Sequence, residues 1–216
     1  MLQEFIEFIT HLDKSLPQFI NDHGNMIYGL LFLIIFVETG LVIMPFLPGD
    51  SLLFTAGALA AADGNPLSMA ILIPLLFVAA VVGDNLNYAV GRFAGHRAMN
   101  LRIGKRNLVK QEWITKTHTF FEKYGTKAII LARFVPIIRT ITPFVAGVGE
   151  MNYRKKFLPF DIAGGFIWIT SMLTCGYLFG NLPWVKAHFE MVVVGIIGIS
   201  ILPMVIGYIQ ARRKKS

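Results

Sequence analysis

Charged residues are scarce in this chain. Of its 216 residues, 15% are charged and 55% are hydrophobic, and the mean hydropathy is +0.60. This composition is too apolar for a water-soluble domain, and the apolar stretches are interrupted too often for one long buried helix. The sequence therefore predicts an all-α polytopic membrane protein.

Several kinds of site are missing as well. The single cysteine, Cys175, excludes an intramolecular disulfide. The five histidines are scattered over connecting segments without metal-ligand spacing, and neither GxxxxGK[ST] nor GxGxxG occurs. GxSxG and HExxH are absent too, and the predicted hairpins described below contain no histidine or cysteine that could act as a nucleophile or base. We therefore expect no metal, no cofactor, no nucleotide-driven transport and no enzymatic activity.

The formal net charge of +7 raises the question of nucleic-acid binding. However, the basic residues flank apolar runs instead of forming one continuous face, and the positive-inside rule explains them better. The connection at residues 93–118 and the tail at residues 210–216 carry many of them, so both are expected in the cytoplasm. The sequence thus predicts a cytoplasmic C-terminus and no nucleic-acid partner.

Three apolar runs are close to the ~20 residues that a membrane-spanning helix needs: residues 68–92, 157–180 and 189–209. The N-terminal residues 1–25 have an apolar stripe at helical spacing and lack the basic start of a signal peptide, which predicts a helix lying at the membrane interface.

Two further apolar runs, residues 26–62 and 119–150, are broken near the middle by Pro, Gly and charge. We predict each to be a re-entrant hairpin of two half-helices, because irregular backbone at membrane depth must be buried in protein or line a wet cavity. Whether residues 26–37 cross the membrane fully stays open.

Short patterns repeat along the chain. FTAG at residues 54–57 recurs as FVAG at 144–147, and YAVG at 88–91 recurs as YLFG at 177–180, both at a separation of about 90 residues. The basic segments place the two hairpins on opposite faces of the membrane. We therefore predict one membrane domain, residues 1–216, built as an inverted repeat of hairpin plus spanning helix, an architecture that places a substrate site near the midplane.

Four charges lie inside the predicted hairpins: Glu38 and Asp50 in the first, Arg133 and Arg139 in the second. Charges are expensive in a bilayer, so such residues are most often functional. Because burial and a nearby arginine shift a carboxylate's pKa in opposite directions, one acid of the pair is predicted to take up and release protons. The arginine fork suits phosphate or carboxylate, which predicts an anionic head-group clamp or counter-ions to the acids. The simpler alternatives are an interfacial Glu38, an Asp50 that caps a half-helix, and arginines that reach the cytoplasmic surface.

A third polar cluster, GDNLNYAVGR, lies at the cytoplasmic end of the first full span. Its Asp84 is expected either to join a proton relay, or to pair with Arg92 or lie at the water line. Asp161, beside a basic loop, is expected to pair with Lys155 or Lys156.

The motifs FLPGDSLLFTAGALA, GDNLNYAVGR and ILARFVPIIRTITPFVAGVGEMNYRKKF, in this order, resemble the DedA family of bacterial inner-membrane proteins, of the VTT or SNARE-associated type, and the DedA subgroup in particular. The resemblance implies two opposed re-entrant hairpins among transmembrane helices. It also implies a transport role, because family members are linked to undecaprenyl phosphate recycling and dependence on the proton motive force, and distant relatives to phospholipid scrambling. The functional positions of the family match Glu38, Asp50, Arg133 and Arg139.

The leading hypothesis is a proton-motive-force-linked flippase of a lipid phosphate, undecaprenyl phosphate, in the bacterial inner membrane. Arg133 and Arg139 would bind the phosphate, and Glu38, Asp50 and Asp84 would couple transport to protons. The alternatives are a proton-coupled small-cation or drug antiporter, a phospholipid scramblase and a non-transporting assembly factor. The expected partners are membrane lipids and protons, and homo-oligomer formation is left open.

Overall fold

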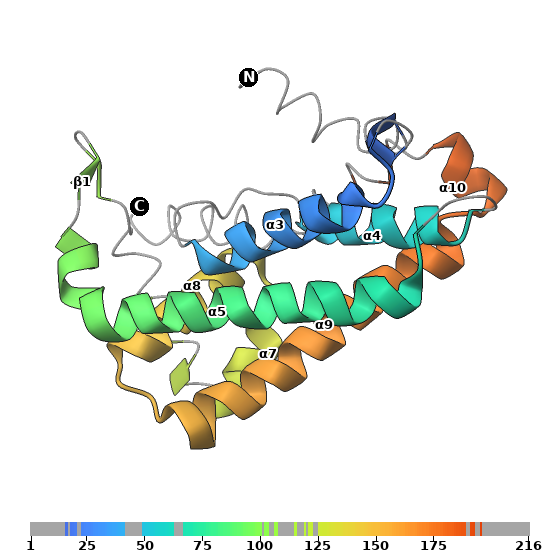
Figure 1. The fold of residues 1–216 in the computed structure, drawn as a ribbon. Helices are drawn as coiled ribbons and strands as arrows, with labels where there is room; N and C mark the ends of the chain where they lie inside the picture. Colours follow the sequence, from blue (N-terminus) through green and yellow to red (C-terminus); the bar gives the residue numbers. More distant parts are fainter. Residues whose placement is uncertain are drawn as a thin grey trace, which may run out of the picture. The chain divides into compact units, whose positions relative to one another are not determined.

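The structure, a computed structural model, describes most of the central part of the chain (Figure 1). The described residues are 16, 18–20, 23–41, 49–62, 67–100, 102–103, 106–107, 115, 119, 121–122, 125–188, 191–192 and 195. The predicted interfacial helix at 1–25, third span at 189–209 and tail at 210–216 lie wholly or mostly outside them.

The described residues are helical apart from turns and one short strand pair. Strand β1 (Arg102–Ile103) pairs antiparallel with β2 (Arg106–Asn107), so that Arg102 lies opposite Asn107. The helices are α3 (Met26–Gly40), α4 (Gly49–Ala60), α5 (Met69–Asn100), η1 (Gly125–Lys127), α7 (Ala128–Ala132), α8 (Pro136–Val148), the π-helical η2 (Tyr153–Phe157), α9 (Leu158–Phe179) and α10 (Pro183–Ala187).

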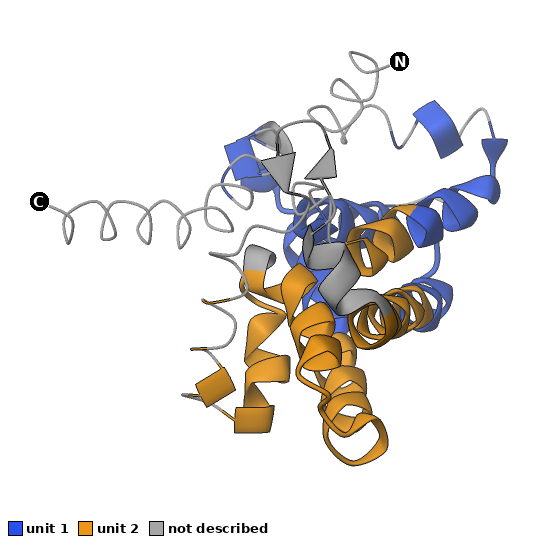
Figure 2. Ribbon diagram, turned by 90° about the vertical axis from the view of Figure 1, so that its left-hand side faces the viewer, with its two compact units in different colours: residues 1–33, 48–76, 169–216 blue, residues 34–47, 77–168 orange. Residues whose placement is uncertain are grey.

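The chain forms two compact units, shown in different colours in Figure 2. Unit 1 consists of Met1–Leu33, Pro48–Leu76 and Ile169–Ser216, and unit 2 of Ile34–Leu47 and Phe77–Trp168. Helices α3, α5 and α9 each contribute one part to each unit.

Within the described part of the chain, two apolar helices are long enough to cross a membrane: Met69–Phe93, of 25 residues, and Tyr153–Phe179, of 27 residues. They coincide with the predicted spans at 68–92 and 157–180. Helix α5 continues to Asn100, so the first residues of the predicted connection at 93–118 are helical. The all-helical architecture and these two spans are as the composition predicts.

The predicted hairpin regions contain shorter helices. Helices α3 and α4 have 15 and 12 residues, and α8 has 13. At about 1.5 Å per residue, α8 is roughly 20 Å long, less than the ~30 Å hydrocarbon core of a bilayer.

The break between α7 and α8 follows from Pro136. A proline disfavours helical backbone in the residue before it, and Val135 is extended, with φ −122° and ψ 103°. Pro136 itself is the first residue of α8, where its missing N–H removes no intrahelical hydrogen bond. Arg139 therefore lies in α8, whereas Arg133 lies before the break, as the C-cap residue of α7.

In unit 2, α5 and α8 approach closely through glycines. A Cβ added to Gly147 would overlap the carbonyl oxygen of Tyr88, and one added to Gly91 would overlap that of Phe144. Small residues permit such close approach of two backbones, which suits helices that have no hydrophobic effect to drive them together in lipid.

Unit 1 contains the same arrangement between α4 and α9. A Cβ on Gly57 would overlap the carbonyl oxygen of Leu173, and one on Gly176 would overlap that of Phe54. Phe54 and Gly57 therefore correspond to Phe144 and Gly147, as the FTAG and FVAG patterns predict.

The second part of the predicted repeat is wrong by one helical turn. The glycine that meets Phe54 is Gly176, not Gly180, and the carbonyl that meets Gly57 belongs to Leu173, not Tyr177. Gly180 also lies in the interface, beside Ala58, so both glycines of α9 fit a small-residue pattern. The letter pattern paired Gly91 with Gly180, whereas the backbone contacts pair it with Gly176, four residues earlier.

Candidate functional site

A buried ion pair joins α3 to α8 in unit 2. Arg139 Nη2 donates a hydrogen bond to Glu38 Oε1, and the two side chains are only 3% and 1% exposed. The guanidinium also lies over the ring of Trp168 from α9, 4.3 Å from its centroid, and that tryptophan is fully buried. A flat guanidinium can stack on an indole and keep its edge for a carboxylate, so α9 supports the geometry of the pair.

Arg133 lies between two aspartates. Its Nη2 donates to Asp161 Oδ1 in the first turn of α9, and its Nη1 is 2.5 Å from Asp84 Oδ2 of α5. The second contact is an ion pair without hydrogen-bond alignment. All three side chains are at most 2% exposed, so Arg133 does not reach a surface.

The side chain of Asn87 in α5 links the backbone next to Glu38 to the backbone next to Arg139. Its side-chain amide donates to the carbonyl oxygen of Thr39 at 3.1 Å and to that of Thr140 at 2.7 Å. Thr39 follows Glu38 directly, and Thr140 follows Arg139. A single fully buried amide therefore sets the backbone positions beside both members of the ion pair.

The helix crossing that carries Glu38 is tight. A Cβ added to Gly40 would lie 3.3 Å from the Cα of Gly83, and one added to Gly83 would overlap the side-chain oxygen of Thr39. This close approach of α3 to α5 is what brings Asn87 within reach of the Thr39 carbonyl.

Among the described residues, three buried carboxylates, those of Glu38, Asp84 and Asp161, lie with two buried guanidiniums. These five groups carry an excess of one negative charge when all are ionised. Within the part of the chain that the structure describes, Asp84 Oδ1 and Asp161 Oδ2 accept no hydrogen bond. Buried acceptors of this kind are where a proton, a water or a ligand group would bind.

Comparison with known proteins identifies the family. The model of the VTT domain matches residues 47–178. Protein DedA of Escherichia coli (strain K12) is 46% identical over 208 residues, which cover 96% of this chain and 94% of that protein. The chain belongs to the DedA family. The predicted resemblance is thereby confirmed.

Other DedA-family relatives are named as membrane proteins. An uncharacterized membrane protein of Mycobacterium tuberculosis (strain ATCC 25618 / H37Rv) is 39% identical over 89% of this chain and 83% of its own length. Inner membrane protein YqjA of Escherichia coli (strain K12) is 35% identical over 74% of this chain and 70% of its own length. No solved structure matches the chain. This DedA-family chain is accordingly a membrane protein.

Of the residues predicted for the DedA-family site, the structure groups Glu38, Asp84, Arg133 and Arg139 in unit 2. Asp50 belongs to unit 1, where it is partly buried in the first turn of α4. The interfacial alternative for Glu38 and the surface alternative for both arginines are wrong, because all three side chains are buried.

Two predicted pairings are also wrong. Asp161 pairs with Arg133 and not with Lys155 or Lys156, whose side chains are exposed. Asp84 pairs with Arg133 as well, whereas Arg92 pairs with Glu150.

Asn87 and Trp168 are parts of the site that were not among the predicted residues. A signal for Asn87 was present: it lies three residues after Asp84 in an otherwise apolar span, on the same helical face. For Trp168 there is no comparable signal, because an indole in an apolar helix usually packs against its neighbours.

Proposed function

We propose that this DedA-family protein is a proton-linked transporter that moves a lipid phosphate such as undecaprenyl phosphate across the bacterial inner membrane. The observation that carries the proposal is that two buried arginines are both held by buried carboxylates. A guanidinium binds phosphate with the same planar fork that it offers to a carboxylate. The carboxylates therefore occupy the positions that a phosphate would take.

Proton linkage follows from the cost of burying charge. When a phosphate replaces Glu38 on Arg139, the buried carboxylate of Glu38 loses this ion pair, which is unfavourable. A proton taken up by that carboxylate removes the cost. If phosphate replaced the aspartates on Arg133, Asp84 and Asp161 would take up protons in the same way. Asp84 Oδ1 and Asp161 Oδ2 already accept no hydrogen bond from the described residues. Binding of phosphate and binding of protons would thus favour each other.

The proposal places the short helices as half-helices of two re-entrant hairpins, α3 with α4 and α7 with α8. Their lengths support it, since none reaches the ~20 residues of a full span. The repeated glycine contacts in the two units support an inverted repeat. In this arrangement the basic segments and the C-terminus are cytoplasmic.

The chain acts in this proposal as a transporter without catalytic residues, a metal or a cofactor. Asp50, the second acid of the sequence prediction, would serve as a further proton carrier from the first hairpin. The partners are membrane lipids and protons, and the number of subunits is left open.

The test is the leaflet distribution of a fluorescent lipid phosphate in liposomes that contain the purified protein and an imposed pH gradient. Addition of a membrane-impermeant quencher measures the outer fraction over time. We expect Glu38→Gln and Arg139→Gln to abolish gradient-driven movement. Glu122→Gln and Arg154→Gln are matched controls, since both remove a charge from an exposed side chain. Movement at the wild-type rate in both site variants would refute the proposal.

A small-cation antiporter is the second candidate, and the excess of carboxylates over guanidiniums among the described buried residues favours it. In that case the arginines are permanent counter-ions, and a cation replaces the proton. The two functions differ in one measurement: only the antiporter releases protons when a small cation is added to the protein without lipid phosphate.

A further inference from the structure

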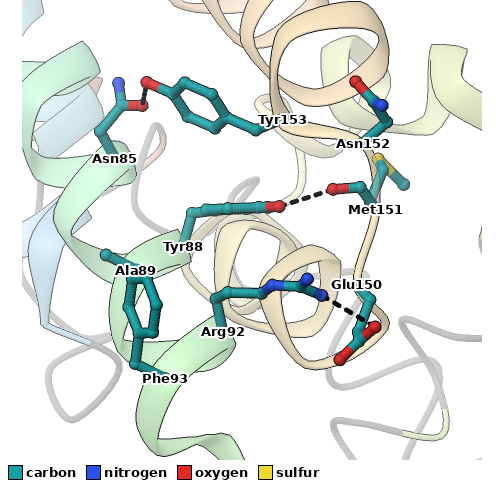
Figure 3. A pocket seen from close by; sticks show the side chains of 9 residues that line it. All are labelled: Asn85, Tyr88, Ala89, Arg92, Phe93, Glu150, Met151, Asn152 and Tyr153. Carbon is teal, nitrogen blue, oxygen red and sulfur yellow. Dashed lines mark hydrogen bonds and ion pairs between the residues drawn. The ribbon is translucent and has the colours of Figure 1, made fainter.

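A second polar site lies in unit 2, at the end of the span in α5. It is a pocket of about 550 Å³, within the range of roughly 300–1,000 Å³ that ligand sites occupy. Figure 3 shows Tyr88 and Arg92 pointing from α5 towards the segment that joins α8 to α9, and Tyr153 pointing back towards Asn85. The lining residues are Asn85, Tyr88, Ala89, Arg92, Phe93, Glu150, Met151, Asn152 and Tyr153, and none belongs to the Glu38–Arg139 site.

The pocket lies near one end of the predicted span at 68–92 and of the apolar helix Tyr153–Phe179. Tyr153 is the first residue of that helix, and Phe93 directly follows the predicted span within α5, which continues to Asn100. The side chain of Phe93 is 88% exposed. Aromatic side chains at span ends are typical of the membrane–water interface, which is the level of lipid head groups.

The guanidinium of Arg92 has N–H donors that a ligand in the pocket could use. The Tyr88 hydroxyl already donates to the Met151 carbonyl, and the Tyr153 hydroxyl to Asn85 Oδ1, both at 2.5 Å. Arg92 meets one oxygen of Glu150 at 3.1 Å, with the two side chains 38% and 75% exposed. An exposed ion pair of this kind is weak, so a stronger anion can replace the carboxylate, and a guanidinium has five N–H donors to offer it.

Glu150 holds an unusual backbone conformation to reach Arg92. Its φ is +54°, and it follows the end of α8 in a turn where its N–H donates to the Gly147 carbonyl and that of Met151 to the Ala146 carbonyl. Glycine is the usual residue at this position of such a turn, because a side chain strains a left-handed backbone. A glutamate there is best explained by the use of its side chain as a removable partner for Arg92.

We infer that this pocket binds the phosphate of a membrane-lipid head group, with Arg92 exchanging Glu150 for the phosphate. Tyr88, Tyr153 and Phe93 line the apolar part, against which the first carbons of the lipid would pack. The exposed side chains of Arg154, Lys155 and Lys156 follow directly in the chain and attract anions to this end of the molecule. The inference concerns binding alone and does not depend on the proposed transport.

The test uses the full-length protein in detergent and native mass spectrometry, with titration of short-chain phosphatidylglycerol, phosphatidylethanolamine and diacylglycerol. We expect both phospholipids to bind and diacylglycerol, which lacks the phosphate, not to bind. Arg92→Gln should weaken phospholipid binding about tenfold, whereas the control Lys127→Gln, which removes an exposed cation that does not line the pocket, should change it less than about twofold.

Glu150→Gln and Glu150→Gly should tighten phospholipid binding, because both remove the competing carboxylate. The glycine variant also relieves the left-handed backbone, so it tests the site in a protein at least as stable as the wild type. If Arg92→Gln does not fold, the phospholipid affinity of the two Glu150 variants tests the inference without it. Equal losses in Arg92→Gln and Lys127→Gln, or unchanged affinity in both Glu150 variants, would overturn the inference. Full displacement of phospholipid by an equal concentration of sodium phosphate would show a site for free phosphate and overturn the assignment to lipid.

Discussion

Replacement of Asn87 tests how the buried site is held together. The side-chain amide of Asn87 is the donor in two hydrogen bonds between helices, to the carbonyls of Thr39 in α3 and Thr140 in α8. Asn87→Leu keeps most of the volume and removes both bonds. Asn87→Asp keeps the shape and replaces the donor by an oxygen that faces two carbonyl oxygens.

The expected loss can be calculated from the two bonds. Hydrogen bonds between membrane helices contribute roughly 0.6–1.7 kcal/mol each, so Asn87→Leu should lower the free energy of unfolding by roughly 1–3 kcal/mol. Asn87→Asp should lower it further, because a buried carboxylate without a counter-ion either stays charged at high cost or must take up a proton. The order of stability is therefore wild type, leucine variant, aspartate variant.

Transport should respond too, because the two threonines directly follow Glu38 and Arg139. Loosening their backbones changes the geometry of the ion pair, and we expect the rate of lipid-phosphate movement to fall roughly tenfold in Asn87→Leu, the equivalent of about 1.4 kcal/mol. A purely structural role would lower stability and leave the rate per folded molecule unchanged.

The assay is unfolding of the purified protein in mixed micelles, followed by helical circular dichroism, together with the liposome measurement. Asn85→Leu is the matched control on the same helix, since Asn85 donates within α5, to Val81, and its contact with Tyr153 is exposed. If Asn87→Asp were as stable as the wild type, the assignment of the amide as the link between α3 and α8 would be wrong.

Two further predictions concern packing and charge. Gly147→Ala should destabilise the protein by roughly 1–3 kcal/mol, because its Cβ would overlap the α5 backbone. Gly29→Ala should be neutral or slightly stabilising, because no described residue outside its own helix would come within 4 Å of the added Cβ. Equal effects of the two in the same unfolding assay would contradict the close approach. Arg133→Met should cost roughly 3–5 kcal/mol, because it leaves Asp84 and Asp161 buried without their cation. Adding Asp161→Asn should restore part of that stability, and a double variant no more stable than Arg133→Met would argue against the pairing.

Much of the helical arrangement can be predicted from the sequence. The spans at 68–92 and 157–180 follow from the length of two apolar runs, and the break before Pro136 follows from the stereochemistry of proline. These features depend on residues close together in the chain, so local composition is enough.

The ion pairs could not be assigned in the same way. Asp161 has lysines five and six residues before it, yet it pairs with Arg133, 28 residues away. Which cation an acid meets depends on how α7 and α9 pack, and in an apolar interior a distant buried partner is worth more than a nearby exposed one. The one-turn error in the glycine repeat has the same origin, because only the packed backbones distinguish Gly176 from Gly180.

The sequence by itself determined that this is a helical membrane protein of the DedA family and that Glu38, Asp84, Arg133 and Arg139 are costly charges in apolar surroundings. The motifs and the family match identify the family. Hydrophobicity along the chain is sufficient for the rest, because the free energy of placing a charge in lipid depends on the residue and its immediate surroundings. Only the tertiary structure decided which charges neutralise one another, that Asp161 joins them, and that one amide positions two helices. Those properties arise from contacts of a few ångströms between distant segments, which no local pattern determines.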